Sequence, residues 1–163
     1  MEVSPYYILL AKLEEEISFQ RKVINTFLFV QQKPSPEITL KTIDILRRLT
    51  QGFRLIALVM DEMESVTDKY MKEQALLLSS ESLSLASLLL PALESLSPIF
   101  LESLRVYDEP ILDRIEAVAE FIENSMQNYE ELATDELAQT IEDIMRTLEY
   151  HIKLGEKAVG KIV

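Results

Sequence analysis

Apolar residues recur along the chain in alternating steps of three and four, which is the period of an amphipathic α-helix and not of a β-strand. Short polar or proline-containing stretches interrupt this repeat and divide it into helical segments. We expect a first helix from Pro5 to Gln31 and a long second helix from Pro36 to Leu78. Three further segments are expected over residues 80–107, 111–132 and 134–162.

Serine and proline mark the expected helix starts. A proline suits the first helical position, and a preceding serine can accept a hydrogen bond from a free amide. Gly52 is the weak point of the second helix, which would be about 60 Å long if unbroken. Either it bends at Gly52 or near Thr67, or it projects and meets a partner. Pro91 predicts a kink or a split in the third segment. The marked starts are Ser4-Pro5, Ser35-Pro36, Ser97-Pro98 and Glu109-Pro110.

The segment from Ser80 to Tyr107 carries apolar residues on all sides, which predicts a helix buried all round. Only three glycines are present, so folds built from tight hairpins are disfavoured. The length of 163 residues fits one domain, and no linker divides it. We therefore expect an all-α, antiparallel bundle of five to six helices over residues 1–163, with the second helix long and the third central and buried.

Composition removes several classes of function. The chain has no cysteine, which excludes disulfides, iron–sulfur clusters, thiolate zinc sites and a cysteine nucleophile. Its net charge is -12, and the stretch from Ser79 to His151 holds 3 basic and 16 acidic residues. Such a surface repels a phosphate backbone, so nucleic-acid binding is not expected. No basic residue precedes Lys12, so we expect no secretory signal and a cytoplasmic location.

The most membrane-like stretch runs from Leu83 to Leu101 and is about long enough to span a bilayer. Glu94, two prolines and several serines within it count against spanning, because polar groups are costly in hydrocarbon. We expect a central bundle helix here, and no membrane partner.

The sequence offers little that could form an active site. It lacks the common motifs for phosphate binding, dinucleotide binding, zinc proteases and serine hydrolases. His151, the one histidine, falls one turn after Leu148 on the last helix, and di-iron bundles need two Glu-x-x-His pairs. We expect a protein that is not an enzyme and has no catalytic residue, metal or cofactor. A site near His151 is the alternative if it is an enzyme.

Four acidic residues line one face of the fourth segment, opposite its apolar line: Asp113, Glu116, Glu120 and Glu123. A solvated helix face is the simplest interpretation. The other two are the binding of a basic protein partner and the binding of a divalent cation by several carboxylates. We name this set the acid row.

Other polar residues are interpreted as surface or register features. The run Glu14–Glu16 followed by Arg21-Lys22 is typical of helix-surface charge. Gln20 interrupts the apolar line of the first helix, as Thr67 and Gln74 do in the second. Polar residues at such positions fix register or oligomeric state, or mark where a helix passes into solvent.

The second helix carries an apolar line from Leu46 to Tyr70, which is longer than the first helix can cover. An exposed apolar surplus marks an interface, and a twofold dimer is the commonest closed arrangement. We therefore expect a homodimer that associates through Met60, Met63, Thr67 and Tyr70.

The order of residues in Phe29–Pro34, followed by Ile43–Leu49, resembles the middle of a PhoU-like repeat, the helical phosphate-uptake regulator family. In that family a helix ends in a Gln-Gln-Pro-like turn and a long helix follows. The terminal stretch Ile152–Val159 is similar to the helix end of the same family. The resemblance implies a regulatory, protein-binding bundle.

The metal-binding carboxylates of the PhoU-like family are not matched. Phe53, Arg54 and Leu58 stand where that family has acidic residues, and only Glu156 agrees at the end of the chain. The resemblance therefore does not extend to multinuclear metal binding.

These observations favour a non-catalytic helical bundle that acts by self-association or by binding another protein. The second hypothesis is a small-ligand or metal-responsive regulator with a pocket inside the bundle, and an enzyme is third. A polar cluster around His151, Gln20 and Thr67 would favour the pocket, whereas a dry core of leucine and serine would favour association.

Overall fold

The computed structural model describes residues 5–28, 35–66, 68–96, 101, 104–127 and 133–162. Within them the chain forms five α-helices, which confirms the all-α bundle expected from the helical period. The helices are α1 (Pro5–Val23), α2 (Pro36–Met63), α3 (Lys69–Leu96), α4 (Ile111–Asn124) and α5 (Thr134–Ile162). A π-helix, η1 (Ile24–Leu28), continues α1, and a 3-10 turn, η3 (Ser125–Gln127), follows α4.

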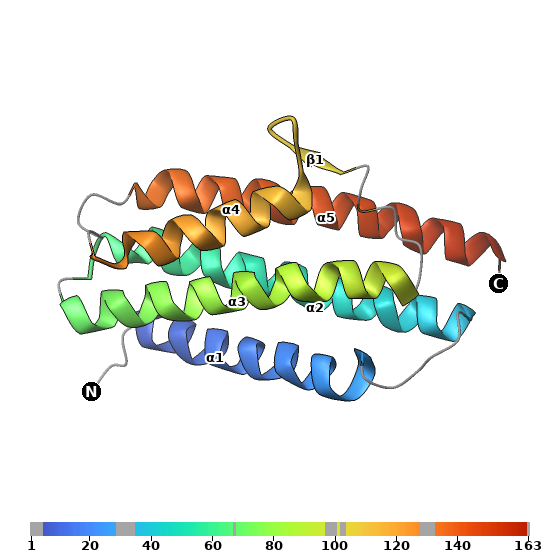
Figure 1. Ribbon diagram of the computed structural model, residues 1–163, viewed down its shortest axis with the longest axis horizontal. Helices are drawn as coiled ribbons and strands as arrows, with labels where there is room; N and C mark the ends of the chain where they lie inside the picture. Colours follow the sequence, from blue (N-terminus) through green and yellow to red (C-terminus); the bar gives the residue numbers. More distant parts are fainter. Residues whose placement is uncertain are drawn as a thin grey trace.

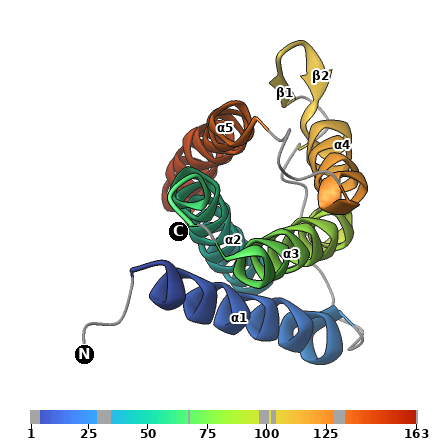
Figure 2. The same ribbon diagram turned by 90° about the vertical axis from the view of Figure 1, so that its left-hand side faces the viewer.

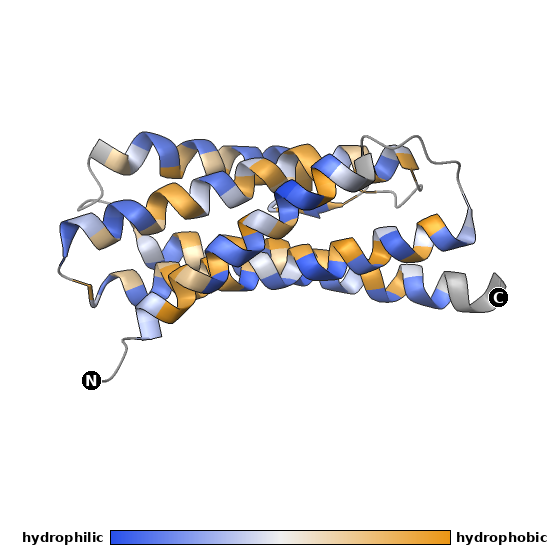
Figure 3. Cartoon of the chain, turned by 90° about the horizontal axis from the view of Figure 1, so that it is seen from below, coloured by the Kyte–Doolittle hydropathy of each residue, from blue (hydrophilic) through white to orange (hydrophobic). Residues whose placement is uncertain are grey.

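Consecutive helices run antiparallel, as expected (Figure 1). Seen end on, α2, α3, α4 and α5 form a ring, and α1 lies outside it against α2 and α3 (Figure 2). Within the ring α4 and α5 make few contacts with each other. The helices show apolar and polar faces along their length (Figure 3). Their apolar faces form one continuous core.

The helix starts follow the serine and proline signals closely. α1 begins at Pro5, and Ser35 caps α2 by accepting a hydrogen bond from the Ile38 amide at 3.2 Å. At α4 the expectation is one residue early, because Pro110 is the capping residue and Ile111 is the first helical one. Ser4, the turn 29–34 of the PhoU-like resemblance and the start expected at Ser97-Pro98 lie outside the described residues.

The second helix is not continuous from Pro36 to Leu78: α2 ends at Met63 and α3 begins at Lys69, so of the alternatives left open by the sequence the break near Thr67 is the one that occurs. A tight turn closes α2, in which the Val66 amide donates to the Met63 carbonyl at 3.1 Å. The Asp68 carboxylate then accepts a hydrogen bond from the Tyr70 amide at 2.8 Å and caps α3. The chain therefore folds back on itself, and α3 starts eleven residues before the expected Ser80.

This break removes the surface expected to mediate dimerisation. Met60 and Met63 are buried in the chain's own core, at 0% and 3% exposure. Tyr70 is exposed on α3, and Thr67 lies outside the described residues. The homodimer stays a prediction, but these four residues do not form one exposed stripe that could support it.

α3 contacts α1, α2 and α4 and is central, as expected, but it is not buried all round. It also continues through Pro91, where a kink or a split was expected, and ends at Leu96. Pro91 is exposed, so the backbone hydrogen bond that a proline cannot donate is absent on the solvent side of the helix. By length and composition α3 could cross a membrane, and no other helix in the described ranges passes this test. Half of its most apolar window is buried inside the bundle.

A small β-hairpin interrupts the helical fold. It forms although the scarcity of glycine disfavours folds built from tight hairpins. Strands β1 (Arg105–Val106) and β2 (Glu109–Pro110) pair antiparallel. The turn residues Tyr107 and Asp108 have positive φ angles of 54° and 63°. This conformation usually requires glycine or asparagine. The tyrosine is held from outside the turn, since its hydroxyl donates a hydrogen bond to Asp143 of α5.

Candidate functional site

One side of α3 is exposed, and its exposed residues carry no charge; Glu81, which lies on the same side between Leu77 and Ser84, is partly exposed and is paired with Arg21 of α1. Its exposed residues from Tyr70 onward follow steps of seven, seven, four, three and four, so they lie on one helix face. Leu77 is 48% exposed and Leu88 is 65% exposed. Figure 2 shows α3 between α1 and α4, with its remaining side facing outward. We name this surface the α3 face, and it consists of Tyr70, Leu77, Ser84, Leu88, Pro91 and Ser95.

The acid row borders the α3 face. All four of its residues are exposed on α4. α4 packs on α3 where the Ser80 hydroxyl donates to the Ala119 carbonyl at 3.5 Å. Glu116 and Glu123 are three residues before and four residues after Ala119, so they lie on the side of α4 nearest α3. No group of three or more acidic or histidine residues within the described ranges is arranged to hold a metal ion.

On its other side the α3 face is bordered by α1, where the charges are balanced. Arg21 of α1 forms an ion pair with Glu81 of α3. The strongly acidic border is therefore the one on α4.

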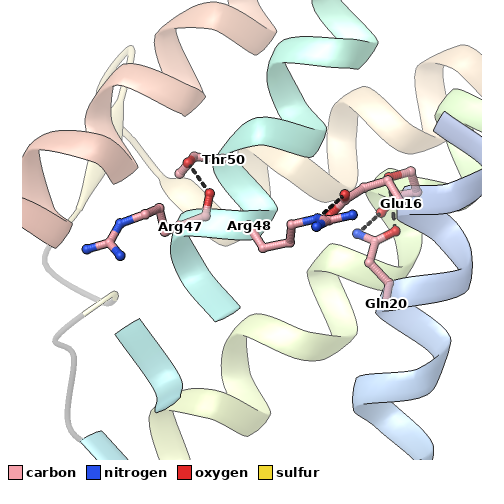
Figure 4. A network of polar contacts seen from close by, with 6 residues as sticks. Glu16, Gln20, Arg47, Arg48 and Thr50 are labelled. Atoms are coloured by element: carbon pink, nitrogen blue, oxygen red, sulfur yellow. Dashed lines mark hydrogen bonds and ion pairs between the residues drawn. The ribbon is translucent and has the colours of Figure 1, made fainter. Parts of the chain in front are cut away.

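A second feature is a buried polar network between α1, α2 and α3 (Figure 4). Glu16 is only 2% exposed, and its Oε2 accepts a hydrogen bond from Arg48 Nε at 2.7 Å. Gln20 lies one turn further along α1 and donates to the Ser82 carbonyl at 3.2 Å. The Ser82 hydroxyl donates back to Gln20 Oε1 at 3.0 Å. The interpretation of Glu14–Glu16 as surface charge is therefore wrong for Glu16, which is buried.

The electrostatics of Glu16 indicate a costly structural contact. Burial raises the pKa of its carboxyl group, and the hydrogen bond and charge of Arg48 only partly oppose this effect. Its Oε1 is buried and has no hydrogen-bond partner in the described part of the chain. The Arg48 guanidinium is nearly half exposed and lies 4.8 Å from the centroid of the Phe19 ring. The network holds α1 against α2 and α3. This agrees with the interpretation that Gln20, a polar residue on the apolar line, fixes the register of the first helix.

The place for the Glu16 side chain depends on Gly52 of α2. A Cβ atom at Gly52 would stand 3.0 Å from Glu16 Cγ and 3.4 Å from its Oε1. We expect Gly52→Ala to lower the free energy of unfolding by about 1–2 kcal/mol, although alanine is the better helix former. Gly155→Ala is the matched control, because no described atom lies within 4 Å of a Cβ there, and it should stabilise α5. Urea unfolding measures both, and equal stabilisation would contradict the steric argument.

His151 lies on α5, whereas the residues of the Glu16 network belong to α1, α2 and α3. It is partly buried, while the neighbouring Ile152, at 6% exposure, continues the apolar line into the core. Three of the positions compared with the PhoU-like pattern, including Glu156, which matches it, have structural contacts here. Phe53 is in the core, Arg54 pairs with Glu149 at 3.3 Å, and Glu156 pairs with Arg47.

A third feature is a cleft of about 280 Å³ between α4 and α5, the two neighbouring ring helices with few mutual contacts. Arg114 lines this cleft and is the one basic residue between Arg105 and Arg146. Sequence reasoning missed the cleft, although a single base within an acidic helix is a signal that could have been noticed. The lining residues are Arg114, Ala117, Val118, Phe121, Ala133, Glu136, Leu137 and Thr140.

Comparison with known proteins places the chain among relatives without an assigned activity. A family described as "Uncharacterized protein" matches residues 6–162. A protein of Aquifex aeolicus (strain VF5), also described as "Uncharacterized protein", is 45% identical over 161 residues, covering 99% of each chain. No solved structure matches the chain. The chain therefore belongs to this family of uncharacterised proteins, which the match defines over nearly its full length.

Proposed function

We propose that this protein is a non-catalytic binding bundle whose α3 face receives an amphipathic, basic helix of another protein. The observation that carries the proposal is the α3 face, with Leu77 and Leu88 exposed and with Glu81, the charged residue between them, neutralised by Arg21, beside the acid row of α4. An apolar strip with a charged border is the usual receptor for a helix whose apolar residues recur at i, i+3 or i+4 and i+7. The resemblance to a regulatory, protein-binding family points to the same class of function.

The size of the α3 face suits one helix. From Tyr70 to Ser95 the strip covers 25 residue steps, which corresponds to about 38 Å of helix. A partner helix of about six to seven turns could lie along it. Its leucine-like side chains would contact Leu77 and Leu88, and its lysine or arginine side chains would reach the acid row.

Charge favours a basic partner over a second copy of this chain. α1 and α4 lie on opposite sides of α3 (Figure 2). In an antiparallel twofold pair across the α3 face, each acid row would oppose the acid row of the other copy. In a parallel pair it would oppose α1, where Arg21 is already paired with Glu81. The net charge of -12 adds general repulsion between copies.

The test uses a labelled model peptide of about six helical turns, with leucine along one face and lysine elsewhere. Fluorescence polarisation measures its affinity for the wild-type protein and for two variants that each add the same negative charge. Leu77→Asp lies on the α3 face and Leu40→Asp lies on α2, and both leucines are 48% exposed. We expect Leu77→Asp to weaken binding at least tenfold, about 1.4 kcal/mol. Leu40→Asp should leave binding within twofold.

Neutralising the acid row tests the charge argument separately. The triple variant Glu116→Gln, Glu120→Gln and Glu123→Gln should weaken binding and flatten its dependence on salt. If both leucine variants bind the peptide equally, adhesion to the acidic surface explains the signal and the proposal fails. Sedimentation of the wild type as a dimer that Leu77→Asp converts to a monomer would assign the face to a second copy instead.

A further inference from the structure

The exposed side of α5 becomes basic toward the end of the helix. Residues 152–163 hold three lysines and one glutamate, in a chain whose net charge is -12. From Arg146 onward the exposed positions recur in steps of three and four, so they lie on one helix face, opposite the buried Ile141, Leu148 and Ile152. We name this surface the α5 basic face, and it consists of Arg146, Tyr150, Lys153, Leu154 and Lys157.

The two acidic side chains that border the α5 basic face are already paired. Glu149 forms an ion pair with Arg54 at 3.3 Å, and Glu156 forms one with Arg47. Both arginines belong to α2, the helix against which α5 packs most extensively. These ion pairs therefore neutralise the border of the face on the side of α2.

The basic side chains of the face are accessible. Lys153 and Lys157 are exposed and form no ion pair with any residue in the described ranges. Arg146 lies 3.7 Å from Glu142, and its side chain is 68% exposed. Asp143, about one turn before Arg146, accepts a hydrogen bond from the hairpin tyrosine. Charges are screened within about 8 Å at physiological ionic strength, so these local groups act on a ligand more strongly than the net charge does.

Two apolar side chains lie among these bases. Tyr150 is 67% exposed and Leu154 is 48% exposed, and the two are one helical turn apart. Together with Lys153 and Lys157 they line an open depression of about 390 Å³, and Glu156 completes the lining. In Figure 1 this part of α5 extends beyond α4. A partner can therefore reach the apolar side chains and the lysines at the same time.

We propose that the α5 basic face binds a short acidic segment of a partner protein. Carboxylates of the segment would pair with Lys153, Lys157 and Arg146. An apolar side chain of the segment would lie against Tyr150 and Leu154. From Arg146 to Lys157 the face covers eleven residue steps, about 16 Å, which suits a segment of about three helical turns. This surface is separate from the α3 face and does not depend on the basic helix proposed there.

Charge and size favour a protein segment over an anionic membrane. The face offers two apolar side chains, whereas an amphipathic helix that enters a membrane surface presents a broad apolar stripe. A membrane is also an extended surface, so it would repel the rest of a chain whose net charge is -12. A short acidic segment meets the basic face alone.

The test uses a labelled peptide of about four helical turns, with leucine along one face and glutamate elsewhere. Fluorescence polarisation measures its affinity for the wild type and for two double variants with the same change in net charge. Lys153→Glu with Lys157→Glu reverses the α5 basic face, and Lys12→Glu with Lys22→Glu reverses two exposed lysines of α1. We expect the first pair to weaken binding at least tenfold and the second to leave it within twofold.

A matched pair of tyrosines tests the apolar contact. Tyr150→Ser should weaken binding about fivefold, because the ring is covered by the bound segment. Tyr70→Ser is the control, since Tyr70 lies on the α3 face and is 64% exposed, close to the 67% of Tyr150. It should leave affinity for the acidic peptide unchanged. Circular dichroism and thermal melting show that each variant is folded.

The leucine and lysine peptide that tests the α3 face keeps the two proposals distinguishable. It should bind equally to the two double variants, because neither alters the α3 face. Absence of binding of the acidic peptide to the wild type, or equal weakening in both double variants, would overturn the assignment of the α5 basic face.

Two further outcomes would assign the face to another occupant and overturn the proposal. One is unchanged peptide binding in the Lys153→Glu and Lys157→Glu variant together with loss of its adhesion to phosphatidylglycerol vesicles, which would indicate a membrane. The other is sedimentation of the wild type as a dimer that this variant converts to a monomer, which would indicate a second copy of the chain.

Discussion

Leu89→Asp is expected to abolish the folded state, whereas Leu88→Asp is expected to leave it intact. The two leucines are neighbours on α3, but Leu89 is fully buried at 0% exposure and Leu88 is 65% exposed. A buried carboxylate without a partner costs several kcal/mol, which is comparable to the whole stability of a domain of this size. At position 88 the same carboxylate stays in water and costs little.

Far-ultraviolet circular dichroism and urea unfolding measure this contrast. The wild type and Leu88→Asp should both show a strongly helical spectrum and a cooperative transition, and Leu89→Asp should show neither. A soluble Leu89→Asp variant that melts cooperatively would mean that α3 is not packed as described. Loss of the fold in Leu88→Asp would mean that the α3 face is covered in the folded protein.

The second large effect is expected at the ion pair between Glu16 and Arg48, where the two partners should respond in opposite directions. Arg48→Met removes the partner of a buried charge and should destabilise the fold by about 3–5 kcal/mol. Glu16→Gln removes the buried charge itself and leaves Arg48, which is nearly half exposed, to be solvated. We therefore expect Glu16→Gln to be neutral or stabilising at neutral pH.

The pH dependence gives an independent measure of the same ion pair. Burial raises the pKa of Glu16 in the folded state above its unfolded value. The folded state therefore binds this proton more readily, so the contribution of Glu16 is greatest at low pH and is lost as pH rises through the folded pKa. The stability of the wild type relative to Glu16→Gln should increase on acidification from about pH 8 to about pH 5.

Arg47→Met is the matched control for the arginine variant. Arg47 is the preceding residue, and its side chain is half exposed where it pairs with Glu156. Surface pairs of this kind contribute about 0–1 kcal/mol. Urea unfolding of the three variants decides the question, and a similar loss in Arg47→Met and Arg48→Met would show that burial of Glu16 is not the cause.

Much of the fold could be predicted from the sequence because it is local. The helical period predicts the all-α class, and Ser35-Pro36 predicts the start of α2 through a cap that the structure confirms. The break after Met63 is one of the alternatives that the sequence leaves open and cannot decide. The apolar period continues past it, and the Asp68 carboxylate that caps α3 is a weak signal among other acidic residues.

The candidate sites were less accessible to sequence reasoning. The acid row was identified, and its exposure on α4 agrees with the solvated face that was its simplest interpretation. Gln20 stands out in the sequence because it lies on an apolar line. The sequence does not distinguish Glu16 or Arg114, because neither stands out from the charged residues around it.

What the sequence by itself determined is which residues share a helix face, because backbone geometry sets that period independently of the rest of the chain. Only the tertiary structure decided which face is covered, since burial depends on which helices pack alongside. α3 shows this clearly, because Leu88 and Leu89 are identical residues in an equally apolar stretch. The helices packed around α3 bury Leu89 and leave Leu88 in water. In the same way, Glu16 is buried beneath Arg48 while Glu14 and Glu15 stay exposed, because α2 and α3 lie against only one side of α1.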